Sequence, residues 1–171
     1  MHRFLHAAYP FGLAGGGLCV VAFILMNFLG AEPIGMNLVF GYIIMPLFVF
    51  VGIKNFRDRF NEGNLHFSQG MTIGFFVYSI IALVSAGFIY LYLQFNMGVF
   101  EAFRQSNLSL MEENHAVLVE QLNQKAYEDT YKSIEKMNIQ DVALNDLLRK
   151  IIPGLFFTII ISIILKRTVQ N

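Results

Sequence analysis

The residue types that support catalysis or metal binding are few in this chain, and their spacing joins none of them into a recognisable site. Hydrolysis inside the membrane would need a serine with a histidine, two aspartates, or histidines around a metal at membrane depth. The four histidines are His2, His6, His66 and His115. Only His2 and His6 have helical i, i+4 spacing, and they lack a third ligand. We therefore expect no catalytic residue, metal or cofactor, and no enzymatic activity.

Cysteine usage and charge exclude further classes of protein. Cys19 is the only cysteine and lies in an apolar run, so no disulfide can form within the chain. Lysine and arginine total 12, as do aspartate and glutamate, so the formal net charge is zero. No basic patch alternates with aromatic residues, and a nucleic-acid partner therefore has no electrostatic support.

The elements that must carry any function are long and apolar. Of all residues 56% are hydrophobic and 14% charged, where soluble domains have roughly a quarter charged. A helix needs about 20 apolar residues to cross a hydrocarbon core of about 30 Å. Residues 10–29, 34–53 and 70–95 meet that length, and residues 151–165 form a shorter fourth run. The sequence thus predicts an all-α polytopic membrane protein with four transmembrane helices.

The fourth run leaves two alternatives open, because Pro153 lies near its start. The proline would either kink a continuous helix or begin a new one in its first turn. Arg149 and Lys150, just before the run, are expected to extend towards the lipid headgroups. The four runs themselves contain no Asp, Glu, Lys, Arg or His. Polar side chains inside them, such as Asn37 and Ser85, are expected to bond across helices.

Residues 96–150 form the one long polar stretch, and their composition predicts an extramembrane helical segment between the third and fourth spans. Ser109 and Glu112 have the spacing of a capping box, which predicts a helix start there. Asn138 is expected to cap a second helix leading into the last span. A narrow, mostly apolar stripe recurs at helical spacing in this segment: Leu108, Met111, His115, Leu118 and Leu122. Such a segment suits binding to a membrane or periplasmic protein partner.

Lysine and arginine in short loops predict the orientation. Lys54, Arg57 and Arg59 lie between the second and third runs, Arg3 near the start, and a basic pair near the end. Because cytoplasmic loops are enriched in these residues, we expect both termini in the cytoplasm of a bacterial inner membrane. Lys54, Arg57 and Arg59 are also candidates for contact with lipid headgroups or a partner.

Glycines at four-residue spacing predict close helix packing. Gly12 with Gly16, and Gly70 with Gly74, form small faces that let helix backbones approach each other. Packing within one chain and a seam between two copies are both open, and so is the oligomeric state.

Two segments resemble a known family. The centre, Gly52-Ile-Lys-Asn-Phe-Arg57-Asp58 followed by Phe67-Ser-Gln-Gly70-Met-Thr-Ile-Gly74, looks like that of a bacterial four-span membrane family catalogued only as a domain of unknown function. The ending from Pro153-Gly154 to Lys166-Arg167 is similar to its last span and basic tail. The resemblance implies a bacterial cytoplasmic membrane and a four-helix layout, and it implies no activity.

The leading hypothesis is a non-enzymatic accessory or scaffold component in contact with membrane lipids. The alternative is a small transporter or channel subunit, motivated by Pro46 inside the second run and by polar residues in the third. An enzyme acting on lipids ranks third and is favoured only by the loop around Arg57.

Overall fold

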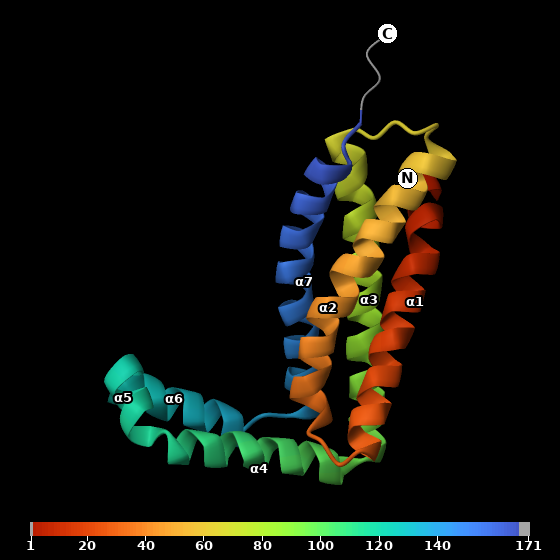
Figure 1. The fold of residues 1–171 in the computed structure, drawn as a ribbon. Coiled ribbons are helices and arrows are strands. Elements are labelled where there is room, and N and C mark those ends of the chain that lie inside the picture. The colour runs from red at the N-terminus through yellow and green to blue at the C-terminus, as the bar shows by residue number, and fades with distance from the viewer. Residues whose placement is uncertain (1, 168–171) are drawn as a thin grey trace. The chain divides into compact units, whose positions relative to one another are not determined.

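The computed structural model describes residues 2–167, and its described residues are helical throughout apart from turns and one isolated β-bridge. Four helices are long and apolar enough to cross a membrane: α1 (His2–Phe28), α2 (Pro33–Asn55) with its π-helical extension η1 (Phe56–Phe60), α3 (Phe67–Phe95) and α7 (Ile139–Leu165). Three shorter helices, α4 to α6, connect α3 to α7 (Figure 1). The predicted all-α, four-span architecture is confirmed.

The chain divides into two compact units. The first, here called the bundle, comprises residues up to Phe88 and from Leu144 onwards, and therefore contains α1, α2 and most of α3 and α7. The second, here called the α4–α6 unit, comprises residues Ile89–Ala143.

Within the bundle, α3 is the most enclosed helix. Half of its most apolar stretch is buried, against a third or less in the other three. Large apolar side chains on the outside of the bundle remain exposed, which suits a lipid solvent rather than water. Examples are Phe28, Ile43, Leu83 and Ile164, each more than 60% exposed.

The turn between α1 and α2 follows from local chemistry. Gly30 ends the first helix with a φ of 72°, a conformation that costs glycine little. Glu32 then caps α2, because its carboxylate oxygens accept hydrogen bonds from the amides of Ile34 (2.7 Å) and Gly35 (2.8 Å). Pro33 occupies the first turn, where its missing N–H is not needed.

Helix α7 settles the alternative at Pro153, which lies inside one continuous helix. The predicted cap at Asn138 is confirmed. Its side-chain oxygen accepts from the amide of Asp141 (3.0 Å), and the Asp141 carboxylate accepts in return from the amide of Asn138 (2.9 Å). The helix therefore begins a full three turns before the apolar run at residues 151–165.

The start of α1 and the residues that follow α7 lie together with the loop after α2. The backbone of Leu65 pairs with that of Arg167 through two hydrogen bonds of 2.6 and 3.0 Å. The start of α1 lies at the same end of the bundle (Figure 1). An even number of crossings requires this arrangement.

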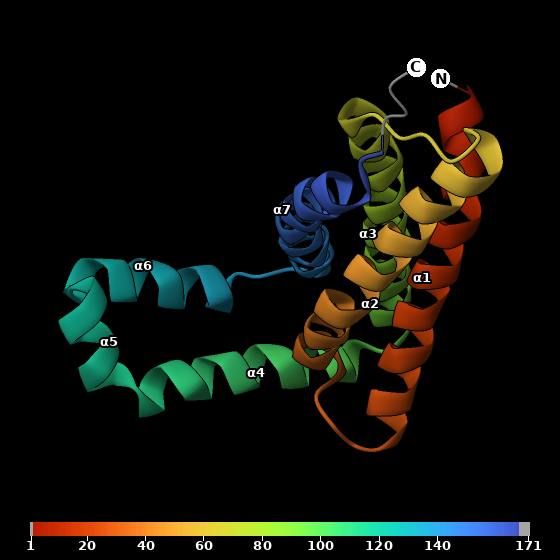
Figure 2. The same cartoon turned by 45° about the horizontal axis from the view of Figure 1, so that its top comes forward.

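The α4–α6 unit folds back on itself. Helix α4 (Met97–Glu113) leads into α5 (His115–Leu122), and α6 (Gln124–Glu135) returns beside α4 (Figure 2). Tyr127 packs edge-on against His115 and donates a hydrogen bond to the Met111 carbonyl (3.3 Å). The predicted helix start at Ser109 is wrong, because Ser109 lies inside α4. The helix instead breaks after Glu113, so the apolar stripe is divided between α4 and α5.

Candidate functional site

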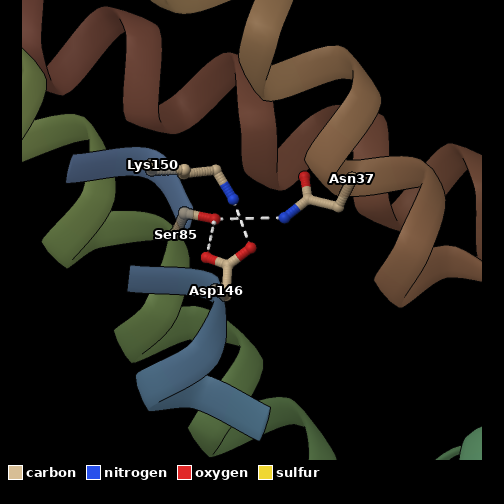
Figure 3. Close-up of polar contacts among 4 residues, drawn as sticks. All are labelled: Asn37, Ser85, Asp146 and Lys150. Carbon is tan, nitrogen blue, oxygen red and sulfur yellow. Dashed lines mark hydrogen bonds and ion pairs between the residues drawn. The ribbon is translucent and has the colours of Figure 1, made fainter. Parts of the chain in front are cut away.

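The bundle buries four polar side chains that bond to one another. Asn37 from α2, Ser85 from α3, and Asp146 and Lys150 from α7 are each at most 4% exposed. Figure 3 shows these four side chains converging between the three helices. We call them the buried quartet. Their positions are far apart in sequence, so tertiary packing brings them together.

The charged part of the quartet lies on one helix. Asp146 and Lys150 are one turn apart on α7, and the Lys150 ammonium forms an ion pair with Oδ1 of Asp146. Both side chains are almost completely removed from solvent. An isolated charge would be very costly at such a position, and the adjacent opposite charge is what makes the burial tolerable.

The neutral members extend the pair to the neighbouring helices. The Ser85 hydroxyl donates to Oδ2 of Asp146 (2.9 Å), and the Asn37 amide nitrogen donates to Oγ of Ser85 (3.1 Å) (Figure 3). Both oxygens of Asp146 thus accept hydrogen bonds, as a carboxylate can. Since the single Ser85 proton is used towards Asp146, the amide of Asn37 must face Ser85 with its nitrogen. The bonds therefore run in one direction, from α2 through α3 to α7.

Gly41 provides the space for the lysine. A Cβ at this position of α2 would lie 2.8 Å from Cε of Lys150, well inside van der Waals contact. The aliphatic stem of Lys150 therefore packs directly on the α2 backbone. Asn37 Oδ1 is buried beside this ion pair and accepts no hydrogen bond from the residues that the structure describes.

The quartet corrects one prediction and extends another. Lys150 was expected at the lipid headgroups, and it is instead fully buried. The predicted run at residues 151–165 contains no charged side chain, but α7 begins at Ile139, and the turns before the run place Asp146 and Lys150 inside the bundle. A count of consecutive apolar residues misses a pair that neutralises itself. The available signal was an aspartate and a lysine at i, i+4 directly before the last apolar run.

The packing glycines lie at contacts between helices of the same chain. Cβ atoms at Gly12 and Gly16 would come within 2.6 and 2.7 Å of Ile80 and Val84, so α1 packs closely on α3. Gly70 packs on the other side of α3 against α7, where a Cβ would lie 2.7 Å from Oγ of Ser162. A Cβ at Gly74 would come even closer to Thr158, which also lies on α7.

The basic residues of the α2–α3 connection lie apart from the quartet, on the end of α2 and on η1. Lys54 and Arg59 are exposed, and Arg57 forms an ion pair with its neighbour Asp58 (2.7 Å). In the part of the chain that the structure describes, no three His, Cys, Asp or Glu side chains lie close enough to hold a metal ion.

This architecture defines a class, the multi-pass all-α membrane proteins, here with a buried polar network in the bundle. Residues 10–167 match the model of the family described as protein of unknown function DUF4199, and the chain belongs to that family. No curated protein and no solved structure matches the chain.

Proposed function

We propose that this protein is a non-enzymatic accessory or scaffold component of the bacterial cytoplasmic membrane, and that its α4–α6 unit binds a membrane or periplasmic protein. Helix α5 carries the proposal. Five of its eight residues, in the sequence His-Ala-Val-Leu-Val-Glu-Gln-Leu, are apolar, yet none is buried. Val117 and Leu122 are 52% and 43% exposed, and Leu110 at the end of α4 is 54% exposed. Exposed apolar side chains gathered on one helix are typical of protein interaction sites.

The buried quartet favours a structural role for the bundle over a catalytic one. Its hydrogen bonds connect α2, α3 and α7, and both oxygens of its carboxylate are already occupied. Such a network favours one packing arrangement of the helices, because a shifted helix would leave a buried charge unpaired.

Substitutions on α5 test the partner. In Val117→Glu/Leu122→Glu, two apolar side chains of α5 become charged, and since neither is buried the fold should survive. Proteins that co-purify with the full chain from native membranes should be lost. Glu120→Gln/Gln121→Glu is the matched control, since it alters exposed polar positions of the same helix. If the partner stays bound to the first variant, α5 is not the docking site and the proposal fails.

The proposed orientation places both termini in the cytoplasm and the α4–α6 unit outside. It is supported by Lys54 in the last turn of α2 and by Arg57 and Arg59 on η1, at the end of the bundle that also holds Arg167. Single cysteines at Asn64 and Lys125, in a Cys19→Ala background, should react with a membrane-impermeant reagent from opposite sides. Labelling of both from the same side would refute the orientation.

A second candidate, a small transporter or channel subunit, is favoured by one observation. Ionisable side chains inside membrane-spanning helices are costly, and they frequently mark ion or proton pathways. Asp146 and Lys150 are such residues. Purified protein in liposomes should then conduct protons or small cations above the level of empty vesicles, and equal flux in the two preparations would exclude this function.

A further inference from the structure

The α4–α6 unit contains a groove of about 560 Å³ where the end of α3 meets the start of α4 and the start of α7. Its walls are partly apolar, with Met97 and Phe100 on one side and Ile139 on the other. Glu101 and Arg104 are its charged lining residues, and they form an ion pair of 2.5 Å. The groove therefore offers one positive and one negative group beside apolar surface.

The groove lies where lipid headgroups are expected. Helix α3 has 29 residues and is about 43 Å long, so it exceeds a hydrocarbon core of about 30 Å and its last turns reach the interfacial layer. Tyr90 and Gln94, which belong to those turns, line the groove. The first residues of α7, the next membrane-crossing helix, line it from the other side. Tyrosine is enriched at this depth, because its ring is apolar and its hydroxyl polar.

We propose that this groove binds a zwitterionic phospholipid through its phosphoethanolamine headgroup. Arg104 provides a planar guanidinium for the phosphate, and Glu101 accepts hydrogen bonds from the primary ammonium. The two charges of the groove sum to zero, which matches a zwitterion better than an anionic headgroup.

The same residues disfavour a phosphocholine headgroup. A trimethylammonium donates no hydrogen bonds and is bound in proteins by cages of aromatic faces. In this groove the face of Phe100 is already covered by Arg104, whose guanidinium carbon lies 5.7 Å from the ring centroid. Glu101, by contrast, is 48% exposed in its side chain and can turn towards an ammonium group.

The test is headgroup selectivity of the full chain. Purified protein in detergent is mixed with equal amounts of phosphatidylethanolamine, phosphatidylcholine and phosphatidylglycerol of identical acyl composition, and bound lipid is measured by native mass spectrometry. The protein should retain at least about ten times as much phosphatidylethanolamine as either of the other two lipids, since the groove selects this headgroup through charge-assisted hydrogen bonds. Equal retention of the three lipids, or preference for phosphatidylglycerol, would overturn the proposal.

Variants locate the selectivity. Glu101→Gln and Arg104→Gln should each lower the retention of phosphatidylethanolamine about tenfold. Glu113→Gln and Lys125→Gln, which change exposed charges of the same unit outside the groove, should leave it unchanged. Circular dichroism checks that each variant keeps its helices. Selectivity that persists in both groove variants would assign the lipid to another site and refute the groove. Loss of a protein partner through α5 substitutions would leave this result unaffected.

Discussion

Removing the members of the buried ion pair singly and together tests whether Asp146 and Lys150 stabilise the bundle only as a couple. Their side chains are 3% and 0% exposed. In Asp146→Leu the buried ammonium loses its counter-charge, and in Lys150→Met the carboxylate retains only the hydrogen bond from Ser85. Each single variant should lose about 3–5 kcal/mol of unfolding free energy, the usual cost of an uncompensated buried charge. The double variant should lie within about 1 kcal/mol of wild type or exceed it.

The assay is reversible unfolding in mixed micelles with a denaturing detergent, followed by far-ultraviolet circular dichroism. Arg104→Gln is the control, because it breaks an ion pair whose side chains are 33% and 48% exposed, and it should change the free energy by less than about 1 kcal/mol. If the double variant loses as much unfolding free energy as the two single variants lose together, the two charges do not stabilise the bundle as a pair. If the single variants match wild type, Lys150 is not in a dry interior.

Two further predictions concern Gly41 and Tyr131. Gly41→Ala should destabilise the bundle by about 1–3 kcal/mol in the same unfolding assay, because its Cβ would press on Lys150, whose ammonium is fixed by an ion pair. Gly17→Ala is the matched control, since a Cβ there meets nothing within 4 Å, and alanine should be neutral or favourable. The hydrogen bond that Tyr131 donates to the Glu112 carboxylate (2.7 Å) raises the pKa of the phenol above its ordinary value of 10.0. The stabilisation by this bond should be present below pH 10 and disappear as the pH rises through the raised pKa. Titrating tyrosinate absorbance in wild type and in Tyr131→Phe measures this pKa. Glu112→Gln should return it towards its ordinary value.

The apolar runs were sufficient to predict which segments cross the membrane, because hydrocarbon thickness imposes a minimum length on any spanning helix. Their boundaries were less predictable. The first predicted run begins at Pro10, whereas helix α1 already begins at His2 and includes polar residues before the run. One of them, Arg3, has its guanidinium 5.6 Å from the centre of the Phe56 ring. The Ser109 pattern was misleading, because serine and glutamate three residues apart also occur inside a helix. Asn138 was identified correctly, since its cap depends on the next three residues alone.

The buried quartet could not be assembled from sequence. Asn37 and Ser85 are 48 positions apart, and Ser85 and Asp146 are 61 apart. Local spacing indicates only the Asp146–Lys150 pair, and a hydropathy window assigns both residues to the polar side of the boundary. Their burial depends on Gly41, whose missing side chain leaves room for the lysine on a neighbouring helix. That dependence appears only when α2 and α7 are packed together.

The variant that removes both charges also separates the two proposed functions. A scaffold requires the quartet only for packing, so Asp146→Leu/Lys150→Met should keep its fold and its protein partner, because α5 belongs to a different unit from the quartet. A transporter requires ionisable groups within the bundle, so the same variant should remain folded while its flux falls to that of empty liposomes. Partner binding and flux measured on one folded variant therefore decide between the proposals. Retained flux would exclude a transport role for the pair, and a lost partner would contradict a purely structural role.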